Sequence, residues 1–460
     1  MVGLSTSGER MDTRHPVDDP EFLRRLHERP HKGLEEWLDA PAHVHHVAHR
    51  MSNPPEERRK SREQFAHILQ SLTISPDELV LHDTFGYGVK TAENGDRLIL
   101  VWQAHTEYYS YQVWHIPSEK TAPLSFGPLA FPQYVFPLSP LGLRVNALDI
   151  LVVRAPQSSV EDVRRLMPGT AIYGSRVFGE EMAVTTSFTP DEHGRERYFI
   201  TAPSPTPMLH VKQLVETIVK IETYYHLILM QKPMFSSAVD QVYRFEQLHL
   251  KQREIITSQL AAAGSTLLQH WLNALTEDVM KVNRLAGLLQ FELSAAVPYD
   301  KIVHASIHSI QEDHLPPYRP LSDYLVTGVT GVAEGYQQLL RRIETLKSGF
   351  EGIIGIIRTR INLLVEGQNL RLLSSVDQTT KSQAVLQHTV EGLSIIVISY
   401  YLSGLGGYIF KGLHEMGWLH QPAVATALFV PVAVGLSFAL MALSRKLIHK
   451  RLIQKRHTDS

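Results

Sequence analysis

Two long apolar runs near the end of the chain dominate its hydrophobic pattern. Residues 393–410 contain no charged side chain, and residues 422–444 contain none either. At a helical rise of about 1.5 Å per residue, the runs measure roughly 27 and 34 Å, which is close to the ~30 Å hydrocarbon core of a bilayer. The pattern therefore predicts two transmembrane helices, at about 393–413 and 422–444. A buried helical hairpin in a soluble core is the alternative.

Basic residues after the second run predict the orientation of these helices. Six Lys or Arg side chains lie between residues 445 and 456, whereas the loop between the runs carries Lys411 and Glu415. Because basic residues are retained on the cytoplasmic side of a membrane, we expect the C-terminus in the cytoplasm. Two crossings then place the large N-terminal region in the cytoplasm as well.

Small residues recur at helical spacing within the first run, at Ser399, Ser403 and Gly407. A ridge of small residues allows two helix backbones to approach closely in lipid. The ridge either packs against the second span of the same hairpin or joins copies of the chain in an oligomer. Both interpretations fit the spacing equally well.

Short runs rich in β-branched and aromatic residues characterise the N-terminal part of the chain. They are bounded by Pro, Gly and Asp, as strands usually are, and they occupy residues 44–51, 98–103, 109–116, 149–155, 182–188 and 197–202. Helical patterns lie among them at residues 55–72 and 159–167. We therefore predict an α+β domain over residues 1–205 with a mostly antiparallel sheet.

Helical periodicity replaces the strand patterns after the proline-rich stretch 203–207. Helices are predicted at 208–232, 236–262, 265–296 and 299–313, and an almost continuous helix runs from residue 321 to the first apolar run. Within it, apolar residues from Tyr336 to Leu364 keep a heptad-like spacing that is typical of bundle or coiled-coil cores. The prediction is an all-α helical bundle and coiled-coil stalk over 206–390, a transmembrane hairpin over 391–444 and a basic cytoplasmic tail over 445–460.

Polar residues interrupt the heptad-like stripe shortly before the membrane, at Arg360, Glu366 and Asn369. A wide solvated face of the helix explains them most simply. Alternatively, they form a polar layer between packed helices, which would fix the register or the oligomeric state at some cost in stability.

Composition narrows the chemistry that this chain can perform. Its 460 residues include no cysteine, so disulfides, cysteine-based zinc sites, iron–sulfur clusters and cysteine nucleophiles are excluded. The formal net charge of -2 gives no general attraction for nucleic acid. We expect no nucleic-acid partner and no cofactor.

A histidine cluster in the first predicted strand is one candidate site. His43, His45 and His49 share one face of the strand, while His46 takes the other. Imidazole suits zinc, copper or nickel, but no carboxylate lies among these histidines to complete a common catalytic metal set. A half-exposed, histidine-rich strand is the simpler interpretation.

The triplet at residues 105–107 is a second candidate site. On a strand, His105 and Glu107 would point to the same face and could serve as general acid and base, although a polar cluster that stabilises the sheet has the same composition. Residues 85–91 (FGYGVKT) superficially suggest a phosphate loop, but the lysine does not follow the second glycine directly, which breaks the required spacing. We interpret that segment as a turn between two elements.

Several stretches of the sequence match one known family. They are residues 102–108 (WQAHTEY), 221–224 (IETY), 358–360 (RTR), 366–369 (EGQN) and, most specifically, 387–401. With these residues the chain resembles the bacterial membrane-anchored proteins called domain of unknown function family 3422. The resemblance implies a protein anchored in the bacterial inner (cytoplasmic) membrane with its N-terminal domain in the cytoplasm, and it implies no established activity.

These features support three hypotheses about function. The first is a non-enzymatic interaction or scaffold protein that oligomerises through its stalk and spans. Its partners would be the lipid bilayer, further copies of itself and an unidentified cytosolic protein. The alternative is a CorA-like oligomeric cation channel built from two spans per chain, although Gly406, Gly407 and Tyr408 stand where a Gly-Met-Asn signature is expected and neither span carries a charge. An enzyme that uses His105 and Glu107 is the third hypothesis.

Overall fold

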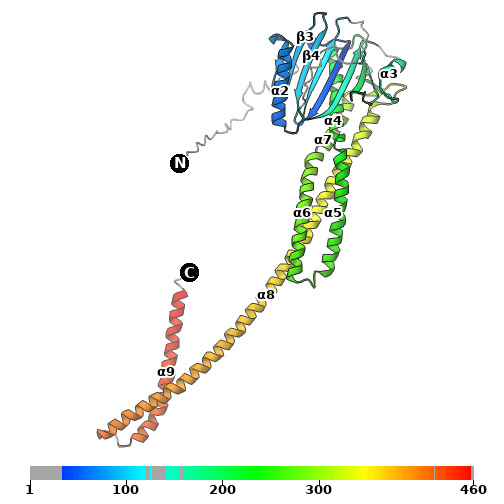
Figure 1. Ribbon diagram of the computed structural model, residues 1–460. Helices are drawn as coiled ribbons and strands as arrows, with labels where there is room; N and C mark the ends of the chain where they lie inside the picture. Colours follow the sequence, from blue (N-terminus) through cyan, green and yellow to red (C-terminus); the bar gives the residue numbers. More distant parts are fainter. Residues whose placement is uncertain are drawn as a thin grey trace. The chain divides into compact units, whose positions relative to one another are not determined.

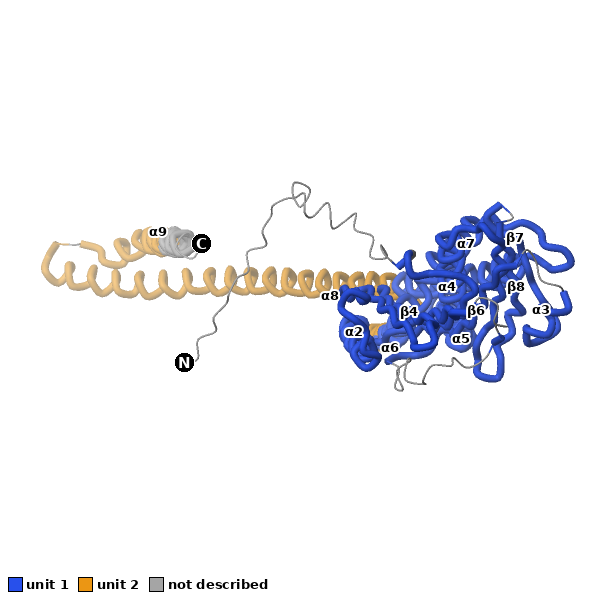
Figure 2. The backbone as a smooth tube through the Cα atoms, turned by 90° about the horizontal axis from the view of Figure 1, so that it is seen from above, with its two compact units in different colours: residues 1–258, 273–353 blue, residues 259–272, 354–460 orange. Residues whose placement is uncertain are grey.

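Figure 1 shows the computed structural model, which describes residues 34–119, 125–126, 141–155, 160–179, 181–418 and 420–456. The start of the predicted α+β domain, residues 1–33, and the end of the predicted basic tail, residues 457–460, lie outside the described residues, as do the side chains of the tail. The chain divides into two compact units, which Figure 2 colours blue and orange. Unit 1 comprises residues 1–258 and 273–353, and unit 2 comprises residues 259–272 and 354–460.

The N-terminal part of unit 1 is a mixed sheet that contains ten strands in the described residues, in the order β10-β7-β8-β9-β6-β1-β5-β4-β3-β2. Neighbouring strands are antiparallel except for β6 and β9, which are parallel. The predicted, mostly antiparallel sheet is therefore confirmed. The strands are β1 Ala42–Arg50, β2 Leu79–Leu81, β3 Phe85–Thr91, β4 Arg97–Ala104, β5 Tyr108–Ile116, β6 Leu143–Val153, β7 Tyr173–Val177, β8 Met182–Thr186, β9 Glu196–Thr201 and β10 Asp313–His314.

The turn predicted at residues 85–91 is wrong, because this segment forms β3 between β2 and β4. Glycine is needed at two positions of this strand because neighbouring side chains pack directly onto its backbone and leave no room for a Cβ atom. A Cβ atom on Gly86 would lie 2.7 Å from the Leu81 side chain, and one on Gly88 would lie 2.5 Å from that of Leu69. The same glycines that suggested a turn are therefore requirements of packing.

Two helices cover one face of the sheet (Figure 1). Helix α2 (Pro54–Ser71) packs Phe65 against Trp102 of β4 and Tyr111 of β5. Helix α3 (Val160–Leu166) buries Val163 in a second apolar cluster with Leu151 of β6. Strand β1 lies between the strands that contribute to these two clusters.

The opposite face of the sheet packs against α4 (Met208–Leu229), which begins directly after the predicted domain boundary. The side-chain amide of Asn146 in β6 donates a hydrogen bond to Oγ1 of Thr223 over 3.1 Å. Leu227 joins Ala48 and Tyr108 in a third apolar cluster. Helix α7 (Ala296–Ser309) packs beside α4.

Long helices follow the sheet, as the periodicity predicts: α5 (Lys232–Gln259), α6 (Ser265–Leu293) and α8 (Leu321–Glu415). The heptad-like stripe lies in α8, and the part of it that belongs to unit 1 is buried. Tyr336 and Phe350 are both 0% exposed. The Tyr336 hydroxyl donates to the carbonyl oxygen of Ile228 over 3.0 Å, and Phe350 packs against His249 of α5. Over these positions the stripe is the core of a helical bundle within one chain.

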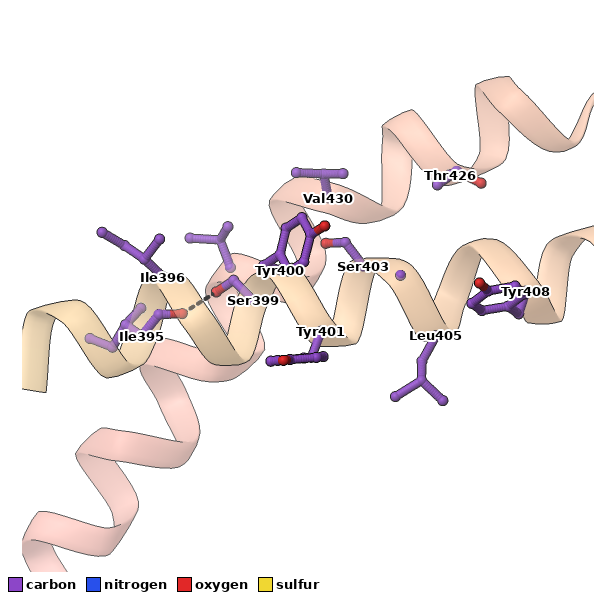
Figure 3. A pocket seen from close by; sticks show the side chains of 12 residues that line it. Ile395, Ile396, Ser399, Tyr400, Tyr401, Ser403, Leu405, Tyr408, Thr426 and Val430 are labelled. Atoms are coloured by element: carbon purple, nitrogen blue, oxygen red, sulfur yellow. Dashed lines mark hydrogen bonds between the residues drawn. The ribbon is translucent and has the colours of Figure 1, made fainter.

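Unit 2 contains the two predicted apolar helices, the last part of α8 and the first part of α9 (Pro422–Arg456). By length and composition both helices are able to cross a membrane. Part of the small-residue ridge faces the second helix of the same hairpin, since a Cβ atom on Gly407 would lie 3.5 Å from Thr426 of α9. Ser399 is 7% exposed. Figure 3 shows Ser399 and Ser403 lining a cavity of about 830 Å³ whose walls come from both helices.

Candidate functional site

The triplet at residues 105–107 connects β4 to β5. The expectation that it lies on a strand is wrong, because β4 ends at Ala104 and β5 begins at Tyr108. The backbone N–H of His105 donates to the carbonyl oxygen of Tyr108 over 2.8 Å and closes the hairpin. Strand alternation therefore does not decide where His105 and Glu107 point.

A cavity of about 470 Å³ opens beside this hairpin. Arg58 of α2, Tyr224 of α4 and Tyr299 of α7 form other parts of its wall. The Tyr299 hydroxyl donates a hydrogen bond to Oε2 of Glu107, and the Arg58 guanidinium donates to the carbonyl oxygen of His105 over 3.1 Å. Helices from both faces of the sheet thus hold the hairpin at the cavity.

Three tyrosine side chains line this cavity, and burial raises the pKa of Tyr108, Tyr224 and Tyr299 above the ordinary value. The hydrogen bond to the Glu107 carboxylate raises the pKa of Tyr299 further. The phenols therefore stay protonated at physiological pH and can donate hydrogen bonds. The His105 ring stacks on Tyr108 with 4.3 Å between ring centroids. Together these groups can bind a polar ligand or a polar side chain of another protein.

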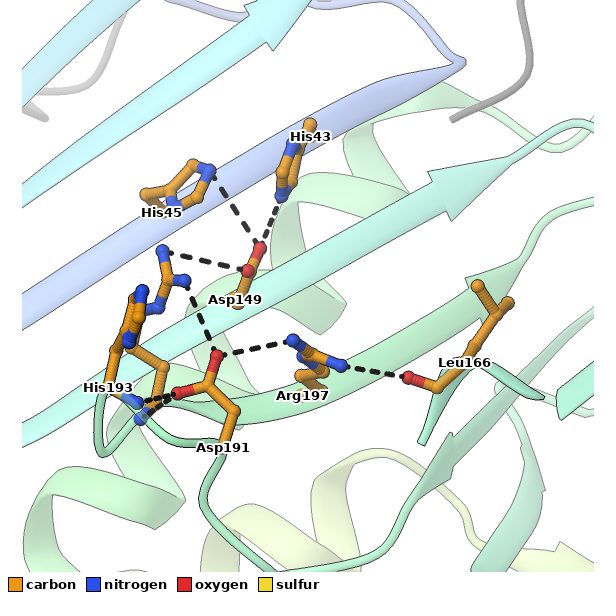
Figure 4. Close-up of polar contacts among 8 residues, drawn as sticks. His43, His45, Asp149, Leu166, Asp191, His193 and Arg197 are labelled. Atoms are coloured by element: carbon orange, nitrogen blue, oxygen red, sulfur yellow. Dashed lines mark hydrogen bonds and ion pairs between the residues drawn. The ribbon is translucent and has the colours of Figure 1, made fainter. Parts of the chain in front are cut away.

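The structure brings two of the three candidate metal-binding histidines together and separates the third. His43 and His45 on β1 both contact Asp149 on β6, and Figure 4 shows the three side chains converging. His49 stacks instead on Tyr109, with 5.3 Å between ring centroids. Sequence reasoning missed Asp149. The signal that could have found it is an aspartate among the otherwise apolar residues 147–153 of β6.

Burial also determines the protonation of three histidines on β1, His45, His46 and His49. Burial, together with the neighbouring His43, lowers the pKa of His45 to about 3. Burial likewise lowers the pKa of His46 to about 3 and that of His49 to about 4. These three rings are therefore neutral at physiological pH, because burial disfavours the charged form of imidazole.

Two arginines lie beside the His43–His45–Asp149 group. A guanidinium nitrogen of Arg195 lies 4.0 Å from Oδ2 of Asp149, and Arg195 and Arg197 each pair with Asp191 over 3.3 Å. The Arg197 guanidinium also lies over the Phe126 ring, 5.2 Å from its centroid. The buried carboxylate of Asp149 thus faces imidazole on one side and positive charge on the other.

A second buried polar cluster lies on the α4 face of the sheet. Nε2 of His226 lies 3.1 Å from Glu196, its Nδ1 lies 3.4 Å from Oε2 of Glu222, and the Tyr198 hydroxyl donates to Glu222. Burial and the nearby Glu222 raise the pKa of Glu196 to about 7. Burial lowers the pKa of His226, but its contacts with the two glutamates outweigh burial and raise it to about 11. This cluster joins β9 to α4.

The three polar residues of the predicted stalk have different surroundings in the structure. A guanidinium nitrogen of Arg360 donates to the carbonyl oxygen of Ala261 over 2.7 Å, in the turn between α5 and α6. Glu366 and Asn369 are exposed. Within one chain, therefore, the structure does not bring Arg360, Glu366 and Asn369 into one polar layer.

Comparison with known proteins yields a family and a distant structural likeness. No curated protein matches the chain. Among solved structures, "The complete structure of CorA magnesium transporter from Methanocaldococcus jannaschii" matches over 69% of this chain and 92% of that chain at 8% identity. Its TM-score of 0.14 gives no support to a shared fold. The model of the family described as "Protein of unknown function (DUF3422)" matches residues 20–448. Because this match covers most of the sequence, the chain belongs to the DUF3422 family.

Proposed function

We propose that this protein is anchored in the inner membrane of a bacterium by its C-terminal hairpin and pairs with a second copy of itself through α8. The sheet domain then acts in the cytoplasm as a binding module for another protein. The two membrane-length apolar helices support the anchoring, and the basic residues after the second one support the orientation. The single observation that carries the pairing is an uncovered apolar surface on α8.

This surface, which we call the seam, lies between residues 369 and 397 of α8. Successive residues of the seam are three and then four positions apart, a spacing that is typical of coiled coils. They are Asn369, Leu372, Val376, Thr379, Gln383, Leu386, Val390, Leu393 and Val397. The six apolar members are between 46 and 67% exposed. Leu372, Val376, Leu386 and Val390 lie before the first apolar run, where exposed apolar patches mark interaction sites. We therefore expect a partner helix to cover the seam.

The distribution of charge favours a second copy of the same helix as that partner. Between residues 369 and 393, the charged side chains lie neither in the seam nor at the positions that flank it: they are Arg371, Asp377, Lys381 and Glu391. Asp377 and Lys381 pair with each other over 2.7 Å on the outer face. Two copies of α8 can therefore meet in register without placing like charges against each other.

The residue types in the seam favour a parallel pair. When Asn369 is numbered as heptad position a, valines take the other a positions except for Gln383, and leucines take the d positions except for Thr379. β-Branched residues at a with leucine at d favour two parallel strands, and one asparagine at a specifies the register. A parallel pair also keeps both hairpins in one membrane, because the last two seam residues, Leu393 and Val397, already belong to the first apolar run.

The sheet domain is proposed to bind rather than to catalyse. In the hairpin cavity, Glu107 is already engaged by the Tyr299 hydroxyl, and burial keeps the neighbouring phenols protonated. The cavity therefore offers fixed hydrogen-bond donors and a fixed carboxylate. Such a surface suits a polar segment of a cytosolic partner protein.

Cysteine cross-linking of the full chain in membranes tests the pairing. Because the sequence contains no cysteine, the variants Leu386→Cys and Val390→Cys each carry a single thiol. Oxidation is expected to convert both into a disulfide-linked dimer on non-reducing gels. His388→Cys is the matched control, since residue 388 lies on the outer face of the same helix turn, and it is expected to stay mostly monomeric.

Two results would contradict this proposal. One is equal cross-linking of all three cysteine variants, which would indicate random encounters in the membrane. The other is a strict monomer in light scattering of the detergent-solubilised chain, together with no cross-link at residues 386 and 390.

A further inference from the structure

Two histidines and an aspartate converge on the middle of the sheet. His43 and His45 are two residues apart on β1 and therefore point to the same face. Across the antiparallel β1–β6 ladder, His45 lies directly opposite Asp149. The possible ligand atoms of the three side chains all lie within 4.8 Å of one another. In Figure 4, both imidazole rings are directed at the Asp149 carboxylate.

Hydrogen bonding leaves this group incompletely satisfied. Asp149 is 0% exposed and His45 is 4% exposed. Nε2 of His45 has no hydrogen-bond partner among the described residues, and it lies 3.8 Å from Oδ1 of Asp149. Because buried polar atoms are nearly always hydrogen-bonded or bound to an ion, this nitrogen requires an explanation. An ion held between the three side chains supplies one.

The two carboxylate oxygens of Asp149 face different groups. Oδ1 contacts Nε2 of His43 and faces His45, whereas Oδ2 lies 4.0 Å from a guanidinium nitrogen of Arg195. Arg195 is itself held by Asp191 over 3.3 Å. Oδ2 has no hydrogen-bond partner among the described residues, so the contact with Arg195 is electrostatic. Oδ1, which faces both histidines, is therefore the oxygen placed as a ligand atom.

The buried cluster of Glu196, Glu222 and His226 on the other face of the sheet has no histidine nitrogen available to bind an ion. Both ring nitrogens of His226 face oxygen acceptors: Nδ1 lies 2.8 Å from the carbonyl oxygen of Glu222, and Nε2 lies 3.1 Å from Oε1 of Glu196. A ring that donates through both nitrogens has no lone pair for a metal. His226 is thus an ion-pair partner, whereas His45 has a nitrogen available.

We propose that His43, His45 and Asp149 bind one divalent transition-metal ion through two imidazole nitrogens and one carboxylate oxygen. Two histidines and a carboxylate form a ligand set of zinc and iron(II) sites that keep at least one coordination position open. The ion ties together β1 and β6, the two middle strands of the sheet. Its open position accepts water or a small anionic ligand.

Zinc binding by the full chain, purified in detergent, tests this site. Elemental analysis after dialysis against Zn²⁺ is expected to find one tightly bound ion per chain. Asp149→Asn and His45→Gln are each expected to lower the Zn²⁺ affinity by at least about tenfold, since each removes one of three ligands. His49→Gln is the matched control: it removes a buried histidine from the same strand and is expected to retain the wild-type affinity.

X-ray absorption spectroscopy of the zinc-loaded wild-type chain gives a readout that does not depend on how well the variants fold. A coordination sphere with two imidazoles and one carboxylate supports the proposal. It is overturned by less than one Zn²⁺ per chain, by an absorption spectrum without two imidazoles, or by an Asp149→Asn variant that folds and binds Zn²⁺ as the wild type does. Loss of Zn²⁺ in both His45→Gln and His49→Gln, with binding retained in Asp149→Asn, would assign the ion to the histidines of β1 instead and would equally overturn it.

Discussion

The hydroxyl group of Tyr299 in α7 donates a hydrogen bond to Glu107 in the β4–β5 hairpin, across 192 residues of sequence. The backbone carbonyl of Glu107 also accepts a hydrogen bond from the N–H of Met51 over 2.8 Å. These contacts hold the hairpin in the wall of the cavity that also contains His105. Tertiary contacts, rather than the alternation of a strand, therefore position this triplet.

Tyr299→Phe tests the contribution of this hydrogen bond, because it removes the donor and keeps the ring. We expect the free energy of unfolding to fall by about 1–3 kcal/mol, since a partly buried carboxylate loses its partner. Denaturant unfolding followed by the fluorescence of the buried Trp102 and Trp114 measures the change. Tyr243→Phe is the control, since Tyr243 is 57% exposed, and an equal effect of both substitutions would contradict the prediction.

The raised pKa of His226 leads us to expect that the stability of the fold depends on pH. Its contacts with Glu196 and Glu222 outweigh burial and raise its pKa to about 11, above the ordinary value of 6.5 for histidine. The folded chain therefore binds this proton more tightly, so the stabilisation is complete below pH 6.5 and is lost as the pH rises toward 11. The pKa of Glu196, raised by burial to about 7 from 4.5, adds a loss of the same sign between these values. We expect the free energy of unfolding to decrease from pH 7 to pH 10.

The variant His226→Gln isolates this effect. Near pH 6.5 it is expected to destabilise the chain by about 3–5 kcal/mol, because it leaves buried carboxylates without their cationic partner. The difference from wild type should shrink by pH 10. Unfolding curves at a series of pH values give both results, with the exposed His67→Gln as control. If the stability of His226→Gln runs parallel to that of the wild type over this range, the assignment is wrong.

Asn369 is expected to control the number of α8 helices that associate. Because an asparagine at a heptad a position specifies a two-stranded pair at a cost in stability, Asn369→Val should strengthen association and allow larger oligomers. Light scattering of the detergent-solubilised chain measures the mass distribution. Gln378→Val changes a polar residue outside the seam and should leave the distribution unchanged. A wild-type distribution for Asn369→Val would argue against a role of Asn369 in pairing.

The hairpin of unit 2 depends on close packing at Gly406. A Cβ atom there would lie 2.6 Å from the Phe429 ring, whereas one on Gly404 meets nothing within 4 Å. Gly406→Ala is therefore expected to destabilise the hairpin by about 1–3 kcal/mol, as overpacking does, and Gly404→Ala should be close to neutral. Detergent-induced unfolding of the reconstituted protein compares the two variants, and equal curves would rule out this packing.

Local patterns predicted most of the secondary structure, because burial of one face imposes a period of about 2 on strands and 3.6 on helices. Strands β1, β4 and β5 are instead buried at nearly every residue, because helices pack on both faces of the sheet, and it was their β-branched and aromatic composition that identified them. Prediction failed at β3, where Gly86 and Gly88 resemble a turn but are required by side chains that pack onto the backbone. Such contacts come from other elements and leave no local periodicity.

The candidate metal site was predicted only in part. His43 and His45 form a visible pair because their spacing of two residues is local. Asp149 joins them only through the pairing of β1 with β6, and it lies 106 residues from His43 in the sequence. Spacing within a strand does not determine which distant strand will lie beside it or in which register.

The sequence by itself determined the two apolar helices of membrane length, the order of a sheet region followed by long helices, and the family. These properties depend on composition and periodicity within short stretches of chain. Only the tertiary structure decided that Asp149 faces His45, that Tyr299 engages Glu107, and that the bundle buries one part of α8 while the seam stays uncovered. These depend on which distant surfaces pack together, because packing removes some side chains from water and leaves others exposed.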